Sequence, residues 1–381
     1  MSTSTISSSD KPKQPRALRW LTNFLLCLGI LLILGFIYQT IASLIDAKRY
    51  PPPGQLVDMG GYKLHLDCKG PVGDGPTVVV DAGLGGGVLS WTLVTAELSD
   101  MRVCAFDRAG MGWSDTGPKS PTAADRNEEL HLLLQKAGIQ PPYVMVGHSL
   151  GGAYAFAYLK RYPDEVAGLV LVDPGNNSST GLFEKWVATQ PLSESERGIF
   201  NAQNEQMNRL MALTPVLQTP EYIKGFMAPF GAIRLYLLFN DPSAKYPPDL
   251  QAQIGDVNRA LDSRSSFYSA YVKEGENATQ VYKDAYANTT GCGDMPILVL
   301  SASQSITPLT PDSPEAKSLS PEMLSYLNLV LRWTGAEHEK LAACSTQGQM
   351  LIVDSSHYMT FDQPGAVASA IRQVSEQQTR K

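Results

Sequence analysis

The sequence lacks the features that bind a nucleic acid or a metal ion. Its 31 lysines and arginines are outnumbered by 37 aspartates and glutamates, for a formal net charge of −6, and the body of the chain holds no basic cluster. A nucleic-acid surface needs such a cluster. The five cysteines follow no metal-ligand spacing. We therefore expect no nucleic-acid partner, no metal and no organic cofactor.

The cysteines differ in their surroundings. Cys27 lies in an apolar N-terminal run and Cys104 lies within a predicted strand, so we interpret both as buried thiols. Cys292 and Cys344 stand at the ends of predicted elements. These two could form a disulfide if the domain faces an oxidising compartment.

The N-terminal region predicts a membrane anchor. Residues 1–17 are polar and rich in Ser, Thr and Lys, and we expect a disordered tail there. Trp20 to Tyr38 then carries no charge and is long enough to cross the hydrocarbon core of a bilayer. We predict a transmembrane anchor over residues 18–40 and a linker over 41–54, ending in a Pro-Pro-Pro-Gly segment.

Basic residues suggest the orientation of this anchor. Four of them lie between residues 11 and 19, whereas Lys48 and Arg49 follow at a distance and Asp46 offsets one of them. The positive-inside rule places the N-terminus in the cytoplasm and the rest of the chain on the other side. A cleavable signal peptide is the alternative, but the apolar run is long for one and no small-x-small cleavage site closes it.

Beyond the linker the pattern is that of an α/β protein. With 43% hydrophobic residues the chain can bury a sizeable core. A hairpin over Gln55–Asp67 comes first, and continuous apolar strands then alternate with helical patterns. The strands are expected at 77–80, 102–106, 143–146, 168–172, 296–300 and 349–353. This rhythm predicts a doubly wound, mostly parallel sheet in a domain formed by residues 55–174 and 295–381.

Residues 175–294 interrupt the rhythm. The segment holds helical patterns separated by Pro-rich turns and no convincing strand, which predicts a helical lid or cap inserted between two strands. Its large apolar residues could line a substrate pocket, or they could form the core of the insertion itself. They are Met207, Met211, Phe226, Met227, Phe230, Tyr236 and Phe239.

The most informative stretch is YVMVGHSLGG, from Tyr143 to Gly152. It reads as a strand, a Gly-x-Ser-x-Gly turn and the start of a helix. Such a turn holds its serine in a strained conformation, and Gly147 and Gly151 avoid collisions across it. We interpret Ser149 as a nucleophile. An ordinary serine in a glycine-bracketed turn is the alternative.

In this order of parts the chain resembles the α/β-hydrolase family from about Leu56 to Val374, apart from the insertion. VVVDAGLGGG is similar to the family's oxyanion loop, DRAGMGWSD to the loop after its fourth strand, VGHSLGG to its nucleophile elbow, and SSHYM with FDQP to its histidine loop. The chain departs from many members at Ala82, where they carry a histidine. The resemblance implies a serine hydrolase of this fold.

A serine hydroxyl needs a general base and an acid that orients the base. Among five histidines, His357 alone lies in a loop between the last strand and the last helix, where the family's base belongs. The acid usually follows the penultimate strand, where no carboxylate appears before Asp312. Part of the family uses the end of the strand after the elbow helix, where Asp173 stands. We favour Asp173 over Asp312, with Asp354 and Glu315 well behind.

Backbone N–H groups of Leu84 and Leu150 would form the oxyanion hole. Gly85–Gly87 are not followed by Gly-Lys-Ser/Thr, so they do not predict a nucleotide loop. We interpret Asp107 and Arg108 as an ion pair that braces the end of the sheet. Two aromatic residues in the neighbouring loops, Trp91 and Trp113, are interpreted as packing residues.

These expectations combine into a membrane-anchored serine hydrolase that cleaves a carboxylic ester or related acyl substrate through an acyl-enzyme. A lipase, aminopeptidase, lactonase, C–C hydrolase or acyltransferase of the same fold is the nearest alternative. A catalytically silent module that binds a small ligand or a partner is an alternative of another class. The presence of both Ser149 and His357 disfavours it.

Overall fold

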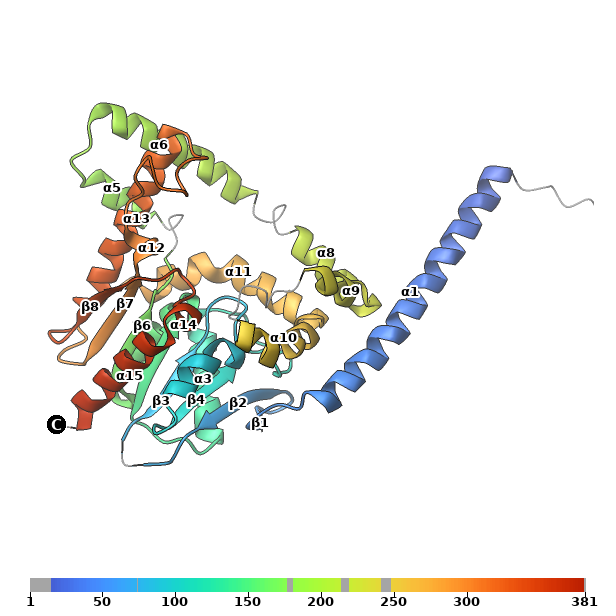
Figure 1. Cartoon of the computed structure of the whole chain (residues 1–381), viewed down its shortest axis with the longest axis horizontal. Coiled ribbons are helices and arrows are strands. Elements are labelled where there is room, and N and C mark those ends of the chain that lie inside the picture. Colours follow the sequence, from blue (N-terminus) through green and yellow to red (C-terminus); the bar gives the residue numbers. More distant parts are fainter. Residues whose placement is uncertain (1–14, 74, 177–180, 214–218, 241–247, 380–381) are drawn as a thin grey trace, which may run out of the picture.

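The computed structural model describes residues 15–73, 75–176, 181–213, 219–240 and 248–379. Figure 1 shows a twisted sheet with helices on both faces, further helices beyond one end of it, and a long N-terminal helix that projects away. Most of the tail predicted over residues 1–17 lies outside the described residues, and its last two positions already belong to the N-terminal helix.

In the part of the chain that the structure describes, eight strands form one sheet in the order β1-β2-β4-β3-β5-β6-β7-β8. β1 and β2 form the predicted hairpin, β2 also pairs antiparallel with β4, and the remaining neighbours are parallel. The predicted mostly parallel, doubly wound α/β sheet is therefore confirmed. The strands are β1 (Gln55–Asp58), β2 (Lys63–Lys69), β3 (Thr77–Asp81), β4 (Val103–Asp107), β5 (Tyr143–His148), β6 (Val166–Val172), β7 (Ile297–Ala302) and β8 (Gln349–Val353).

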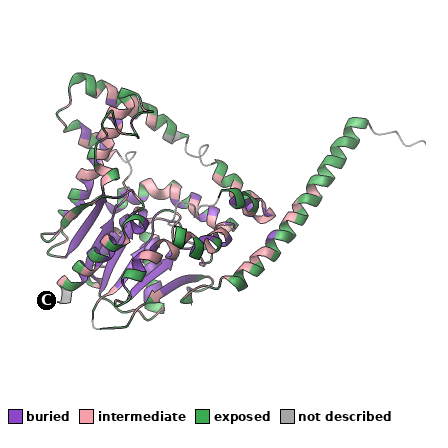
Figure 2. Cartoon of the chain, viewed as in Figure 1, coloured by how far each residue is buried: buried purple, intermediate pink, exposed green. Residues whose placement is uncertain are grey.

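Both faces of the inner strands are buried (Figure 2). Along β3, Val79 packs on one side with helices α3 and α4, whereas Val78 and Val80 pack on the other side with α2 and α15. Polar groups are excluded from such strands and emerge at their carboxyl ends, where open α/β sheets place their sites. The covering helices are α2 (Thr92–Glu97), α3 (Ala123–Lys136), α4 (Leu150–Arg161), α13 (Pro321–Ala342) and α15 (Pro364–Thr379).

The described part of the insertion is helical and contains no strand. Met207 packs into a core between α5, α6 and α13, and Met227 packs into a second core between α8, α9 and α11. Phe226 and Phe239, by contrast, are exposed, so neither of the two predicted uses holds for them. The elements are α5 (Leu182–Ala188), α6 (Glu194–Ala212), α8 (Thr219–Met227), the 3₁₀ turn η4 (Ala228–Phe230), α9 (Ala232–Phe239), α10 (Pro248–Asp262) and α11 (Ser265–Ala285).

Helix α1 (Arg16–Arg49) is the one helix in the described residues that is long and apolar enough to cross a membrane. It continues past residue 40 to Arg49, so most of the segment predicted as a linker is helical. Its basic last turn, with Lys48 and Arg49, lies toward the negative end of the helix dipole, which favours cations there.

The cysteine predictions are partly wrong. Cys104 is buried on β4 as expected, but it forms a disulfide with Cys68, its direct partner across β2. Cys27 is exposed on α1 instead of buried. Cys292 and Cys344 form the second disulfide, which joins the loop before β7 to the turn after α13. The pairing of Cys68 was not foreseen because it depends on the order of strands in the sheet.

Removal of the second disulfide tests its contribution to stability. The Cys292→Ser, Cys344→Ser double variant of the full chain in detergent should lose about 2–4 kcal/mol of unfolding free energy, because a cross-link of this span restricts the unfolded chain. Urea unfolding followed by tryptophan fluorescence measures the loss. Cys27→Ser is the matched control and should leave the midpoint unchanged. Equal midpoints for all three proteins would contradict a stabilising cross-link.

Candidate active site

The turn between β5 and α4 lifts Ser149 to the carboxyl edge of the sheet. Its backbone has φ 53° and ψ −120°, a conformation that residues other than glycine rarely adopt. A Cβ atom on Gly147 would collide with the Gly151 carbonyl oxygen, and one on Gly151 would collide with the carbonyl oxygen of Asp81. The strained turn that the sequence predicts is therefore present, and only glycines fit on either side of Ser149.

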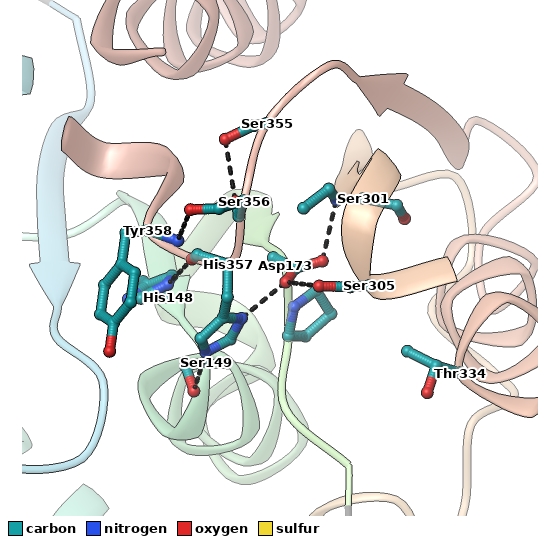
Figure 3. A network of polar contacts seen from close by, with 12 residues as sticks. His148, Ser149, Asp173, Ser301, Ser305, Thr334, Ser355, Ser356, His357 and Tyr358 are labelled. Carbon is teal, nitrogen blue, oxygen red and sulfur yellow. Dashed lines mark hydrogen bonds and ion pairs between the residues drawn. The ribbon is translucent and has the colours of Figure 1, made fainter. Parts of the chain in front are cut away.

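Three of the predicted side chains meet at this turn (Figure 3). His357 lies in the loop after β8, just before the short helix α14 (Met359–Asp362). Its Nε2 atom is 2.9 Å from Ser149 Oγ, and its Nδ1 atom is 2.6 Å from Asp173 Oδ2. An ionised carboxylate can only accept, so Nδ1–H donates to Asp173 and Nε2 is left to accept the Ser149 hydroxyl proton.

The surroundings of Asp173 hold it as a carboxylate. Its side chain is 2% exposed, whereas that of His357 is 43% exposed. Oδ1 accepts from the Ala302 backbone N–H at 2.9 Å, and Oδ2 accepts from Ser305 Oγ at 2.6 Å. Burial alone would raise the pKa of Asp173, but the hydrogen bonds from His357 and Ser305 outweigh it and lower the pKa. The carboxylate therefore stays ionised at neutral pH.

Two other histidines support this arrangement without facing Ser149. His148 Nε2 donates to the His357 backbone carbonyl at 2.7 Å and so braces the histidine loop. His338 Nε2 donates to the Pro174 carbonyl at 2.9 Å, next to Asp173, and its Nδ1 is 2.7 Å from Ser301 Oγ. Burial lowers the pKa of His338, so it is neutral and accepts that hydroxyl proton at Nδ1.

The two residues predicted for the oxyanion hole lie beside Ser149. Leu150 is the first residue of α4 and directly follows Ser149. Leu84 follows Gly83, whose Cα lies so close to the turn that an added Cβ would be 3.2 Å from Ser149 Cβ. Both residues thus belong to segments in contact with Ser149.

A buried charge cluster fixes the loop that carries Leu84. The Arg108 guanidinium donates to the Ala82 and Gly83 carbonyl oxygens, both at 2.7 Å. It also pairs with Asp81 at 2.5 Å and with Glu274 of α11 at 2.7 Å. Burial alone would raise the pKa of Glu274, but Arg108 and, to a smaller extent, the nearby Gly85 backbone N–H lower it. One arginine therefore joins the sheet, the oxyanion loop and a helix of the insertion.

The predicted ion pair between Asp107 and Arg108 is wrong. The Asp107 carboxylate instead accepts from the backbone N–H groups of Val88 and Trp113, at 2.8 and 2.9 Å, and contacts His65 Nδ1 at 2.7 Å. Neighbouring residues at a strand end point in opposite directions, which separates the two side chains. Asp107 organises the loops on one side and Arg108 those on the other.

A cleft of about 300 Å³ opens beside the turn. It lies between the oxyanion loop, the histidine loop and helices α10 and α11. Gly83 and His148 contribute from the sheet side, and Phe267 and Tyr271 of α11 contribute from the insertion. Of the seven apolar residues singled out in the sequence, the six whose side chains the structure describes do not line this cleft, and the side chain of Met211 lies outside the description.

Sequence reasoning missed several residues that contact the site. Ser305 lies in the segment after β7, where a carboxylate is expected but absent. Its hydroxyl donates a hydrogen bond to Asp173. Tyr282 of α11 is buried close to Ser149, and burial raises the pKa of this phenol to about 12. For Ser305 the sequence offers one signal, its place in the Ser303-Gln304-Ser305 segment directly after the penultimate strand. By contrast, Asp312 is exposed in the loop before α13.

The chain belongs to the α/β-hydrolase fold family. Residues 76–311 match the family described as the alpha/beta hydrolase fold, a span that covers more than half of the chain and includes β3 to β7. The resemblance stated for the sequence is thus confirmed, as is the fold class.

Individual relatives share parts of the chain. It is 40% identical over 104 residues to the bovine (Lyso)-N-acylphosphatidylethanolamine lipase, which covers 26% of this chain and 30% of the lipase. A probable transporter, efuK, of Hormonema carpetanum is 24% identical over 340 residues, which covers 86% of this chain and 43% of that protein. The chain spans less than half the length of the curated relatives it matches.

Solved structures agree on the fold alone. The crystal structure of DBJA superposes with a TM-score of 0.54 at 17% identity, covering 86% of this chain and 96% of that one. The enol-lactonase from Burkholderia xenovorans LB400 superposes with a TM-score of 0.51 at 18% identity, covering 84% of this chain and 99% of the lactonase.

Glu274→Gln tests the charge cluster. The variant removes one of the two carboxylates that neutralise the buried Arg108, and we expect the unfolding free energy to fall by up to about 3–5 kcal/mol. Glu276→Gln on the same helix is the matched control, because Glu276 is exposed and should change stability by less than about 0.5 kcal/mol. Chemical denaturation of the two variants measures both. Equal losses would contradict a structural role for the Arg108–Glu274 pair.

Proposed function

We propose that this protein is a serine hydrolase that cleaves a carboxylic ester through Ser149, His357 and Asp173. The observation that supports this most is the unbroken hydrogen-bond series from Asp173 through His357 to Ser149, with 2.6 and 2.9 Å separations. In this series each atom has the donor or acceptor character that nucleophilic catalysis requires.

The reaction would proceed in two halves. Ser149 Oγ attacks the acyl carbon while its proton moves to His357 Nε2, and the carbonyl oxygen becomes an oxyanion held by the Leu84 and Leu150 N–H groups. The C–O bond to the alcohol then breaks, and the alcohol leaves with the proton from His357. Water attacks the acyl-enzyme, its proton passes through Nε2 to Ser149, and the carboxylic acid departs. Asp173 stabilises the imidazolium in both halves.

The shape of the cleft and the relatives favour an ester with an apolar acyl part. Phe267 and Tyr271 present aromatic surface across the cleft from the oxyanion loop. The bovine relative is named as a lipase of N-acylated phospholipids. Hydrolysis of a lactone or an amide, or acyl transfer, would use the same three side chains and comes second.

A silent binding module is the alternative of another class. It would need the cleft but not the activated serine, so labelling by a fluorophosphonate probe separates the two. Labelling of the wild type that is absent in Ser149→Ala supports the enzyme. A folded wild type that neither labels nor hydrolyses any ester would favour the binding module.

Substitutions in the three side chains test the mechanism directly. Ser149→Ala and His357→Ala should each reduce kcat/KM for p-nitrophenyl esters by at least about 10³-fold, because the nucleophile and base act as one unit. Asp173→Asn should reduce it by orders of magnitude as well, since a neutral amide cannot stabilise the imidazolium. A series of acyl chain lengths measured on the full chain in detergent also gives the preferred size of the acyl group.

Asp312→Asn is the matched control for the acid. Asp312 is exposed, so the variant should retain wild-type kcat/KM. If Asp312→Asn were inactive and Asp173→Asn active, the acid would be misassigned. Ser305→Ala should give an intermediate loss, because Asp173 keeps its Ala302 and His357 partners but loses one hydrogen bond.

We further propose that α1 is an uncleaved anchor with a cytoplasmic N-terminus and that the domain lies on the other side of the membrane. The arginines at residues 16 and 19 precede the apolar run, in agreement with this orientation. Two disulfides within the domain favour an oxidising compartment, because the cytosol keeps thiols reduced.

Protease treatment of intact cells with a permeable outer layer tests the orientation. The domain should be digested without lysis, while an epitope placed before residue 11 should stay protected until the membrane is opened. Immunoblots against both parts give the answer. A protected domain, or a domain released without its N-terminal segment, would refute the anchored orientation.

A further inference from the structure

Helices α8 and α9 turn an apolar face away from the rest of the domain. We call it the α8–α9 apolar face and define it by five residues. Ile223, Phe226, Leu235, Leu238 and Phe239 are exposed by 54, 72, 58, 65 and 82%. Single exposed apolar side chains are normal, but a cluster of this size marks an interaction surface. Figure 2 shows exposed residues along both helices.

This exposure does not result from poor packing of the two helices. The opposite side of α9 is buried, because Ile233 and Leu237 pack with Ala228 and with Tyr268 of α11. Residues 233 and 237 are one helical turn apart, and residues 235, 238 and 239 lie on the other side of the helix. Helix α9 thus has one apolar side that packs in the core and a second apolar side that faces outward.

The charges on these helices are neutralised within the protein. Between residues 219 and 239 the chain carries only Glu221, Lys224 and Arg234. Glu221 and Lys224 pair with each other at 2.7 Å, and Arg234 pairs with Asp46 of α1 at 2.6 Å. Paired charges lower the penalty of placing such a segment in a medium of low dielectric constant.

The same segment packs against α1 (Figure 1). A Cβ on Gly35 would collide with the Phe230 carbonyl oxygen, and one on Gly231 would lie 2.8 Å from the Tyr38 ring. One turn further along α1, Gln39 hydrogen-bonds with Arg234 and with the Ser263 carbonyl, at 3.2 and 3.3 Å. Contacts to the cap thus begin within the apolar run of α1 and become polar where that run ends.

These contacts set the depth of the segment. The apolar run from residue 20 to 38 is about 28 Å long at about 1.5 Å per residue, close to the thickness of a hydrocarbon core of about 30 Å. Gly35 is three residues before the end of the run and therefore about 4–5 Å inside it. Amphipathic helices at a membrane surface lie about 5–10 Å deep. Phe230 contacts α1 at this depth, and its ring centroid is 6.0 Å from that of Phe226, which belongs to the α8–α9 apolar face.

We infer that the α8–α9 apolar face is a membrane-contacting surface whose partner is the phospholipid interface of the leaflet from which α1 emerges. The inference rests on the proposed anchor, because the depth follows from the position of α1 in the bilayer. Its basis is the continuity of the face with α1, the paired charges and the matching depth. Helices α8 and α9 then lie in the lipid interface next to α1.

The surface lies close to the candidate active site. Phe267 packs against the core of α8 and α9 and also lines the cleft beside Ser149. One layer of side chains therefore separates the lipid-facing helices from the cleft. The proposed lipid contact is thus adjacent to the cleft where an amphiphilic acyl substrate would react.

Fluorescent labels measure the contact with lipid. The full chain with Cys27→Ser is reconstituted in phosphatidylcholine vesicles, and Phe226→Cys or Phe239→Cys carries an environment-sensitive NBD group. The emission of both labels should shift to the blue and be quenched by nitroxide lipids. Val72→Cys is the matched control, because Val72 is 84% exposed in the loop between β2 and β3 and should be neither shifted nor quenched.

The possible outcomes distinguish a bilayer from a second copy of the chain as the partner of this face. Labels at Phe226 and Phe239 that behave like the label at Val72, in protein that resists carbonate extraction and remains active, would overturn the inference but not the anchor or the enzyme. Energy transfer between two labelled chains without quenching by nitroxide lipids would replace the bilayer with a second copy of the chain. Loss of the protein from the vesicles on carbonate extraction would instead refute the anchor, and the inference with it.

An activity readout complements the labels. The triple variant Phe226→Ser, Leu238→Ser, Phe239→Ser should hydrolyse a water-soluble p-nitrophenyl ester as fast as wild type, because none of these residues lines the cleft. Its hydrolysis of an ester embedded in vesicles should fall by about tenfold, because the cap no longer sits in the interface. Equal ratios for the two substrates in variant and wild type would count against the inference.

Discussion

The Arg108 guanidinium sits where three parts of the molecule meet, and its hydrogen bonds determine how they fit. It is buried between Asp81 at the end of β3 and Glu274 of α11, while its remaining N–H groups hold the Ala82 and Gly83 carbonyls. Without Glu274 this buried cation would keep one carboxylate, Asp81, in place of two, so the position of α11 over the sheet stabilises the loop that carries Leu84. The insertion thus contributes a residue that supports the candidate site.

The sequence predicted the parts of this structure that depend on local pattern. Each predicted strand is present, because a buried parallel strand needs a continuous apolar run and the turns between strands carry glycine or proline. The Ser149 turn was predictable since a Gly-x-Ser-x-Gly between a strand and a helix permits few other conformations. The placement of His357 and the choice of Asp173 over Asp312 came from family resemblance, and the short distances between these three side chains agree with it. Their catalytic roles stay predictions.

What the sequence did not reveal depends on long-range neighbours. The Cys68–Cys104 disulfide requires that β2 pair with β4, and nothing local to either cysteine indicates this. Glu274 and Tyr282 lie in an insertion whose helices have no family pattern, so their approach to Arg108 and Ser149 is visible only in three dimensions. The wrong Asp107–Arg108 pair has the same origin, because adjacency in sequence does not imply contact when successive side chains of a strand point in opposite directions.

The position of Asp173 at the end of β6 has a consequence for how this fold can vary. Ser149 and Asp173 follow neighbouring strands joined by α4, so their separation is set by the spacing of about 4.8 Å between paired strands. Both are in place before the chain enters the insertion, and only His357 arrives after it. A change in the length of the insertion before α11 would therefore leave two of the three groups in place, as long as α11 keeps Glu274 beside Arg108. The part of the insertion before α11 can thus vary, while the ends of β5 and β6 keep Ser149 and Asp173 in register.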